Sequence, residues 1–217
     1  MIRRAFDKLT QGRVPWVTLT VSLGALAVLL FGDQARELLI YDRGAIDGGQ
    51  WWRLWTAHLV HADALHLFWN LSAFASLAGH YEIAPEGGRN RLLAMLAASS
   101  TLVGVGLYTL FPEWITYSGL SGVCYAPLIA LLVLLGQRTG TAVFRWLVAG
   151  VVLKVGVELW VGGGLFEWFG SLQTATEVHA LGLLVGAAAV LAWHSPRRTR
   201  SNQTVPDDLR SPLAGRV

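Results

Sequence analysis

Six long apolar segments constrain the fold of this 217-residue chain more than any other feature. A membrane-spanning helix needs about 20 predominantly apolar residues in a row, within a range of roughly 17–25. Charged residues make up only 14% of the chain, against about 25% in a typical soluble domain. The sequence therefore predicts an all-α polytopic membrane protein, a bundle of six helices. The segments are 16–32, 64–82, 92–111, 120–136, 143–163 and 173–194.

One membrane domain is predicted at 16–195, between a cytoplasmic N-terminal segment (1–15) and a polar tail (196–217). The tail is rich in Arg, Ser and Asp, a composition that favours disorder. The first apolar stretch has basic residues before it, but no small-residue cleavage site after it. It is therefore predicted to be a retained helix and not a signal peptide.

The placement of Lys and Arg predicts the orientation of the chain in the membrane. With the N-terminus in the cytoplasm, the inside segments hold 13 of the 17 basic residues. The outer loops hold Arg36, Arg43 and Arg53, and Lys154 lies within a span. Because basic residues concentrate in cytoplasmic loops, both termini are predicted to be cytoplasmic, and the fourth span begins at the outer side. The first outer loop, 33–63, contains three tryptophans, which suit a loop in the headgroup layer.

The fourth apolar segment opens on Gly119-Leu120-Ser121-Gly122. Glycine is entropically unfavourable in a helix and a hydroxyl in lipid needs a partner, so these residues are unusual at the mouth of a membrane helix. In one interpretation, small neighbours let a substrate backbone approach the Ser121 hydroxyl, with backbone N–H groups nearby to hold an oxyanion. In the other, they form a packing face between helices. The short segment predicts a helix surrounded by its neighbours, with its N-terminus in a water-filled cavity.

A histidine in the sixth apolar segment bears on these two interpretations. His179, Gly182 and Gly186 are spaced i, i+3 and i+7, so they share one helical face. The glycines let this helix approach a neighbour closely. The fourth segment, with Gly122 and Ala126, is the expected neighbour.

The predicted chemistry is that of a dyad of Ser121 and His179. A close approach of the two helices would bring the His179 imidazole to the Ser121 hydroxyl, from which it could accept the proton. An ionisable residue inside a span is by default a functional hypothesis, and the alternative is a histidine bonded to a backbone carbonyl. No third member of a triad is apparent, since Glu177 points to another side of its helix. Tyr125, one turn after Ser121, either packs on the imidazole or fills the core.

His66 and Asn70, at i and i+4 near the start of the second segment, present an imidazole and an amide on one face. With the backbone N–H of Ser121, they could form an oxyanion hole. The backbone at Gly119 is a further candidate for this site. A buried Asn needs a partner, which is either the reaction site or a neighbouring helix.

Other chemistries fit the sequence less well. His58, His61 and His66 are spaced like possible zinc ligands, but no His-Glu-x-x-His is present, and no metal site is predicted. An aspartyl intramembrane protease would need two membrane aspartates, which the apolar segments lack. Lys154 and Glu158, at i and i+4 in the fifth segment, are expected to neutralise one another, either as a structural pair or in contact with substrate. An ion transporter that uses these groups is the remaining rival of another class.

Together, these residues resemble those of the rhomboid intramembrane serine proteases, over roughly residues 50–190. The resemblance rests on the order and spacing of several residues and not on any single motif. It implies that Ser121 is the nucleophile and His179 the base, and that His66 and Asn70 help to hold the oxyanion. Ala57 is a departure, because many rhomboids have a further histidine there. The residues that would support the site are Tyr125, His61, Gly122 and Gly182.

Within this family, the chain looks most like the rhombosortase branch, through residues 52–63 and the Lys-x-x-x-Glu of the fifth segment. The implied role is to cleave the C-terminal Gly-Gly-containing sorting helix of exported proteins, at the outer side of a bacterial inner membrane. The implied partners are such transmembrane-helix substrates and the lipid bilayer, with no cofactor and no nucleic acid. The alternatives are a general rhomboid protease and an inactive rhomboid-like binding protein. The presence of both Ser121 and His179 argues against the second alternative.

Overall fold

The structure is a computed structural model that describes residues 13–164 and 175–194. Its six long helices coincide with the six predicted apolar segments, to within three residues at each end. The predicted N-terminal segment up to residue 12, the polar tail and the start of the sixth apolar segment lie outside the described residues. The long helices are α2 (Trp16–Leu30), α6 (Ala64–Ile83), α7 (Arg89–Leu110), α8 (Ser121–Thr139), α9 (Val143–Val161) and α10 (Thr176–Trp193).

Three of the described helices, α7, α8 and α10, are long and apolar enough to cross a membrane. A fourth span results if α2 and the short helix α3 (Gly32–Leu39) are counted together, although the chain bends by 119° between them. Two other long helices carry polar side chains among their apolar ones, including Asn70 on α6 and Lys154 and Glu158 on α9. The count of six spans therefore stays a prediction.

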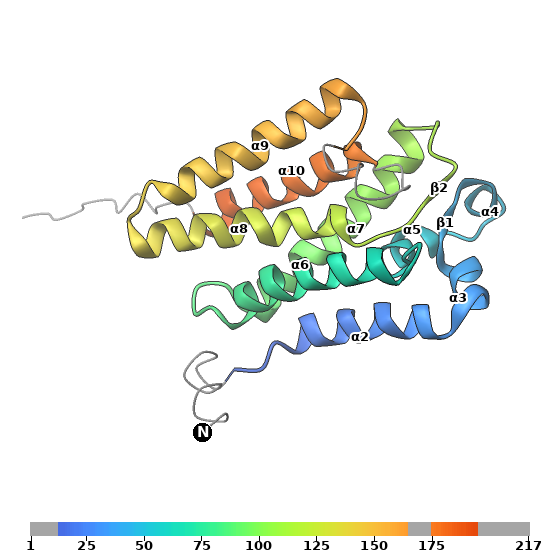
Figure 1. The fold of residues 1–217 in the computed structure, drawn as a ribbon, viewed down its shortest axis with the longest axis horizontal. Coiled ribbons are helices and arrows are strands. Elements are labelled where there is room, and N and C mark those ends of the chain that lie inside the picture. Colours follow the sequence, from blue (N-terminus) through green and yellow to red (C-terminus); the bar gives the residue numbers. More distant parts are fainter. Residues whose placement is uncertain (1–12, 165–174, 195–217) are drawn as a thin grey trace, which may run out of the picture.

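Helix α8 is at the centre of the bundle, where it packs against α6, α7, α9 and α10. Figure 1 shows it between α6 and α10. On α8 itself, only residues 137–139 in the last turn are exposed. The predicted burial of this short helix by its neighbours is thus confirmed. The other five long helices have large apolar side chains on their outer faces, a distribution that suits lipid contact; examples are Leu23, Trp69, Leu110, Trp160 and Leu191.

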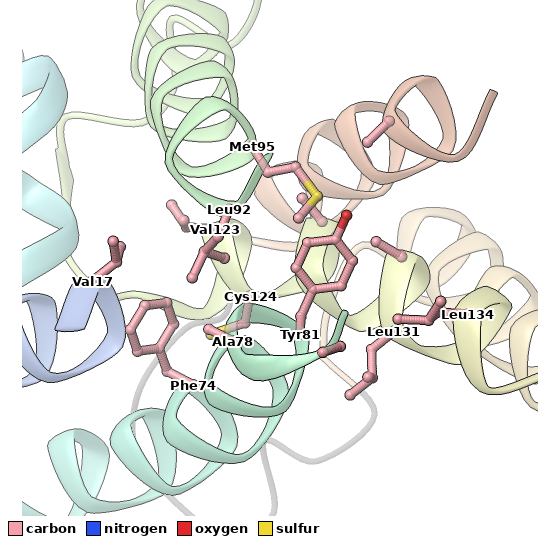
Figure 2. Close-up of a cluster of buried hydrophobic side chains, with 14 of the residues drawn as sticks. Val17, Phe74, Ala78, Tyr81, Leu92, Met95, Val123, Cys124, Leu131 and Leu134 are labelled. Atoms are coloured by element: carbon pink, nitrogen blue, oxygen red, sulfur yellow. The ribbon is translucent and has the colours of Figure 1, made fainter. Parts of the chain in front are cut away.

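The main apolar core lies where α6 and α7 pack on α8 (Figure 2). Phe74, Ala78 and Tyr81 of α6 are spaced i, i+4 and i+7, so they share the face that turns inward. Leu92 and Met95 of α7 meet them at i and i+3, and all five side chains are at most 1% exposed. This packing fixes the position of α6 beside α8.

The chain between α2 and α6 forms short elements at one end of the bundle (Figure 1). Strand β1 pairs antiparallel with β2, which precedes α8, and this pairing sets Tyr41 opposite Tyr117. The guanidinium of the buried Arg53 donates to the carbonyls of Glu37 (2.7 Å) and Ile40 (2.8 Å). The strand pairing holds the loop against the chain that leads into α8, and the Arg53 contacts hold the loop together. Besides α3, the short elements between α2 and α6 are β1 (Tyr41–Asp42), α4 (Arg43–Asp47), α5 (Arg53–Thr56) and the 3₁₀ turn η1 (Ala57–Leu59); β2 (Thr116–Tyr117) follows α7.

Glu82, near the end of α6, joins α2 to the bundle at the opposite end. Its buried carboxylate accepts hydrogen bonds of 2.9 Å from the backbone N–H groups of Val17 and Thr18 and from the Thr18 hydroxyl. The first N–H groups of a helix have no partner within it and carry a positive partial charge. The carboxylate satisfies these groups and thereby fixes the start of α2.

Candidate active site

Ser121 is the first residue of α8, and the chain that leads into it is held from two sides. The N–H of Gly119 donates to the carbonyl of Ala57 (3.1 Å), and the hydroxyl of Tyr117 donates to the carbonyl of Gly119 (2.8 Å). Gly119 has a φ of +126°, and a Cβ there would lie 3.1 Å from the His66 ring. Only glycine adopts this conformation without strain. Gly119 therefore lets the chain turn into α8 with His66 packed against it.

Helices α8 and α10 approach each other through glycines, as the sequence predicted. A Cβ on Gly182 would lie only 1.9 Å from the carbonyl oxygen of Gly122. One turn further along, a Cβ on Gly186 would lie 3.1 Å from backbone atoms of Ala126. A side chain at Gly182 would force the two backbones apart, so this close packing depends on the absence of one.

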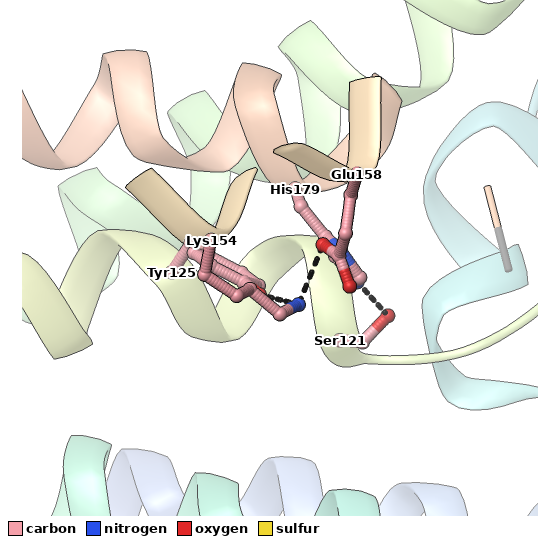
Figure 3. Close-up of polar contacts among 5 residues, drawn as sticks. All are labelled: Ser121, Tyr125, Lys154, Glu158 and His179. Atoms are coloured by element: carbon pink, nitrogen blue, oxygen red, sulfur yellow. Dashed lines mark hydrogen bonds and ion pairs between the residues drawn. The ribbon is translucent and has the colours of Figure 1, made fainter. Parts of the chain in front are cut away.

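The close packing brings His179 of α10 to Ser121 of α8 (Figure 3). Nε2 of His179 lies 3.3 Å from Oγ of Ser121. The imidazole is buried, and both residues line a cavity of about 460 Å³ between α6, α8, α9 and α10. A hydroxyl and an imidazole at this distance can share a proton, which is the arrangement needed to activate a serine.

Tyr125 stacks on the imidazole of His179. The ring centroids are 4.6 Å apart and the ring planes are inclined by 29°. Of the two roles that the sequence left open for Tyr125, packing on the imidazole is the one present in the structure. The Tyr125 hydroxyl also accepts a hydrogen bond of 2.7 Å from Nζ of Lys154, which ties α8 to α9.

Glu158 of α9 also reaches this site, and the sequence did not place it there. Its Oε2 lies 2.6 Å from Nζ of Lys154 and 3.2 Å from Nδ1 of His179 (Figure 3). The expected pairing of Lys154 with Glu158 is present, but the carboxylate contacts the histidine as well. In the sequence, two ionisable residues one turn apart in an apolar segment indicate a functional role. Their spacing does not show how α9 is rotated, and so does not show that Glu158 faces α10.

His66 and Asn70 line the same cavity as Ser121. Nδ2 of Asn70 donates to the carbonyl of His66 (3.0 Å), and a primary amide keeps a second N–H for another acceptor. His66 and Ser121 also share a second cavity of about 270 Å³, which is bordered by β2. The structure thus brings the predicted pair and both predicted side-chain oxyanion donors around one space.

His61 packs against His66, with ring centroids 5.0 Å apart and an interplanar angle of 68°. Its Nδ1 faces the carbonyl of Leu59 at 3.3 Å. Burial, together with the neighbouring His66, lowers the pKa of His61 to about 4. His61 is therefore uncharged at neutral pH and supports His66 by packing.

His58 was grouped with possible metal ligands in the sequence, but its ring has other partners. Nδ1 faces the carbonyl of Gly119 at 3.4 Å and Nε2 faces the carbonyl of Ser100 at 3.2 Å. It thereby links η1 to α7 and to the loop before α8, a role that the sequence did not reveal. Among the residues that the structure describes, no group of three or more His, Cys, Asp or Glu side chains is arranged to hold a metal ion.

Comparison with known proteins adds an independent observation. The rhomboid domain family matches residues 48–196, which is more than half of the chain. The chain belongs to the rhomboid family. Proteins named rhomboid protease GlpG, from Salmonella newport and Salmonella typhimurium, are each 30% identical to this rhomboid over 183 residues. The similarity covers 82% of this chain and 62% of each relative, so the chain spans less than two thirds of their length.

All of the candidate site residues of this rhomboid lie within the matched range.

Gly119 was predicted at the oxyanion site, but its N–H donates a hydrogen bond to the carbonyl of Ala57. It therefore shapes the site through its conformation and its contact with His66. The backbone N–H of Ser121, by contrast, is the first of α8, and the first N–H of a helix has no hydrogen-bond partner within that helix.

Proposed function

We propose that this rhomboid is an intramembrane serine endopeptidase in which Ser121 is the nucleophile and His179 the general base. The observation that carries the proposal is the 3.3 Å contact between Oγ of Ser121 and Nε2 of His179, in a cavity between helices. The neutral imidazole takes the hydroxyl proton as Oγ attacks the peptide carbonyl, and later gives it to the leaving amine. Water, activated by the same imidazole, then releases the acyl group from Ser121.

The oxyanion is assigned to the N-terminal end of α8 and the facing side of α6. The backbone N–H of Ser121 lies at a helix N-terminus, whose partial positive charge favours a developing negative charge. The side chains of His66 and Asn70 line the same cavity and supply the other donors. Donors placed in advance in such a site stabilise the transition state strongly, because they need no reorganisation as charge develops.

The proposed setting is a bacterial inner membrane that the chain spans six times, with both termini in the cytoplasm. The distribution of Lys and Arg supports this orientation, since 13 of 17 then lie on the inside. Ser121, at the start of α8, would face the outer side. A substrate helix would reach the cavity from the lipid and unwind at small or helix-breaking residues.

The proposed substrates are exported proteins with a C-terminal Gly-Gly-type sorting helix, as for a rhombosortase. This proposal is supported by the resemblance of residues 52–63 and by the Lys154-x-x-x-Glu158 of α9. A general rhomboid protease that cuts other single-span substrates is the second candidate, favoured by the similarity to proteins named rhomboid protease GlpG. An inactive rhomboid-like binding protein is disfavoured, because the serine and the histidine lie within reach of each other.

The test uses purified protein in liposomes with two fusion substrates. One carries a Gly-Gly tail followed by an apolar helix and basic residues, and the other carries a general rhomboid substrate helix. The proposed protease is supported if wild type cleaves both fusions, or the Gly-Gly fusion alone, and if Ser121→Ala cleaves neither. Efficient cleavage of the general substrate with no cleavage of any Gly-Gly tail would remove the rhombosortase assignment and leave the protease. Cleavage of neither substrate would support the binding protein.

A further inference from the structure

We infer that Glu158 is a positioning residue for His179, so that the reactive pair works as a triad of Ser121, His179 and Glu158. The inference rests on the proposed function, in which His179 is the base. The two ring nitrogens of His179 face different groups: Nε2 is 3.3 Å from Oγ of Ser121, and Nδ1 is 3.2 Å from Oε2 of Glu158. The sequence predicted a dyad without a third member, whereas the structure places a carboxylate behind the histidine.

The contact with Glu158 selects the form of the imidazole that can act as a base. An ionised carboxylate only accepts hydrogen bonds. Nδ1 therefore carries the ring proton and donates a hydrogen bond to Oε2. Nε2 is then the unprotonated nitrogen, which can accept the proton of Ser121. The negative charge also stabilises the imidazolium that forms when this proton is taken. Glu158 needs no contact with substrate for either effect.

Lys154 makes an ionised Glu158 tolerable in this place. Glu158 is 1% exposed, and an unpaired charge at such a depth is strongly unfavourable. Nζ of Lys154 lies 2.6 Å from the same Oε2 that faces His179. The Lys154 ammonium also donates to the hydroxyl of Tyr125, whose ring stacks on His179. The four side chains thus form a closed ring of contacts across α8, α9 and α10 (Figure 3).

The alternative is that Lys154 and Glu158 only neutralise each other within α9. An i, i+4 ion pair of this kind needs no further partner. A neutral pair at the same positions would satisfy a structural role but would not orient His179. Replacing both charged residues at once therefore distinguishes the structural role from the positioning role.

The test compares Glu158→Gln and the double variant Lys154→Met/Glu158→Gln with wild type. Purified protein in liposomes is assayed for kcat and KM on the single-span fusion that wild type cleaves, for the rate of labelling by a fluorophosphonate, and for melting temperature. Glu82→Gln is the matched control, because it changes another buried glutamate far from the site.

We expect Glu158→Gln to lower kcat and the labelling rate by about 10²–10⁴-fold with little change in KM. The double variant should regain the stability that Glu158→Gln loses, since no charge is left unpaired, while its kcat stays low. If Glu158→Gln does not fold, the double variant alone decides. Recovery of both stability and kcat in the double variant would overturn the inference. So would a change confined to KM.

Ser121→Ala, measured in parallel, distinguishes failure of the inference from failure of the proposed function. If Ser121→Ala is inactive while the Glu158 variants are fully active, the triad is ruled out and the proposed function stands. If Ser121→Ala is active, the proposed serine mechanism itself is ruled out.

Discussion

Two glutamates, Glu82 and Glu158, are buried in this bundle to similar extents, at 5% and 1% exposure. Glu82 lies near the end of α6 and Glu158 near the end of α9, and these two helices end on opposite sides of the bundle (Figure 1). Glu82 accepts its hydrogen bonds from the first turn of α2, where two of the three donors are backbone N–H groups. Glu158 faces the ammonium of Lys154 and the imidazole of His179. The partners of Glu82 have no proton to exchange at neutral pH, whereas one partner of Glu158 is the proposed base. The role of a buried carboxylate thus follows from its partners and not from its burial.

Both carboxylates also illustrate how a buried charge is tolerated in this helical bundle. At Glu82, the helix N-terminus supplies positive partial charge, and Nε of Arg89 lies 3.8 Å away. At Glu158, a full positive charge is supplied by Lys154 in the preceding turn of the same helix. The contacts of Glu82 fix where α2 starts, whereas the contacts of Glu158 leave its carboxylate beside the imidazole of His179. The predictions below exploit this difference.

The largest effect is expected from Ser121→Ala and His179→Ala, at the Glu158 end of the molecule. Each should lower the cleavage rate by about 10⁶-fold, as when a nucleophile or base is removed from a serine protease. The melting temperature should change little in Ser121→Ala, which removes a single oxygen atom, and should fall more in His179→Ala, which removes a buried ring stacked on Tyr125. Initial rates and thermal unfolding of purified protein measure both quantities. Substantial residual proteolysis by Ser121→Ala would rule out the proposed mechanism.

The next largest effect is expected from His66→Ala and Asn70→Ala. Loss of one oxyanion donor should lower kcat by about 10²–10³-fold and change KM little, since the donor acts mainly in the transition state. His80→Ala is the matched control, because His80 lies on the same helix but is exposed near its other end. Steady-state kinetics on one substrate measure the split. A change confined to KM would instead assign His66 and Asn70 a structural role.

Gly182→Ala should affect activity and stability together. The new Cβ would meet the carbonyl of Gly122 at 1.9 Å, so α10 has to move away from α8 and take His179 with it. Overpacking should lower stability by about 1–3 kcal/mol. The displaced base should lower cleavage by about 10²-fold. Gly156→Ala on α9, where a Cβ meets nothing within 4 Å, is the control. Equal activity and stability in the two variants would contradict the importance of the close approach.

The smallest effect on catalysis is expected from Glu82→Gln. The amide would place an N–H₂ group against backbone donors, so stability should fall by about 1–3 kcal/mol. The kcat of the folded protein should stay within about threefold of wild type, because the substitution touches no group at the site. Thermal unfolding and kinetics on the same sample measure this. A large loss of kcat in folded Glu82→Gln would erase the distinction between the two glutamates.

The positions of the long helices could be predicted from the sequence because the length of an apolar run is a local property. The pairing of Ser121 with His179 was also accessible, since Gly182 and Gly186 on the face of His179 indicate which surface packs closely. These small residues carry information about a neighbour as well as about their own helix. The structure shows the resulting contact at 3.3 Å.

The contact of Glu158 with His179 was not predictable, because the i, i+4 spacing relates Glu158 only to Lys154 on its own helix. Which way that face turns depends on how α9 packs on α8 and α10, which is a property of three helices. The engagement of the Gly119 N–H by Ala57 was missed for a similar reason. It joins two loops that are distant in sequence, and no periodic pattern reports such a pair.

The most direct test of the proposed activation of Ser121 by His179 is fluorophosphonate labelling of the purified protein, which needs no knowledge of the substrate. Labelled protein is digested, and the modified residue is identified by mass spectrometry. We predict one modified residue, Ser121, with labelling abolished in Ser121→Ala and at least about 10²-fold slower in His179→Ala. Labelling at another residue, or an equal rate in His179→Ala, would contradict the assignment of nucleophile and base.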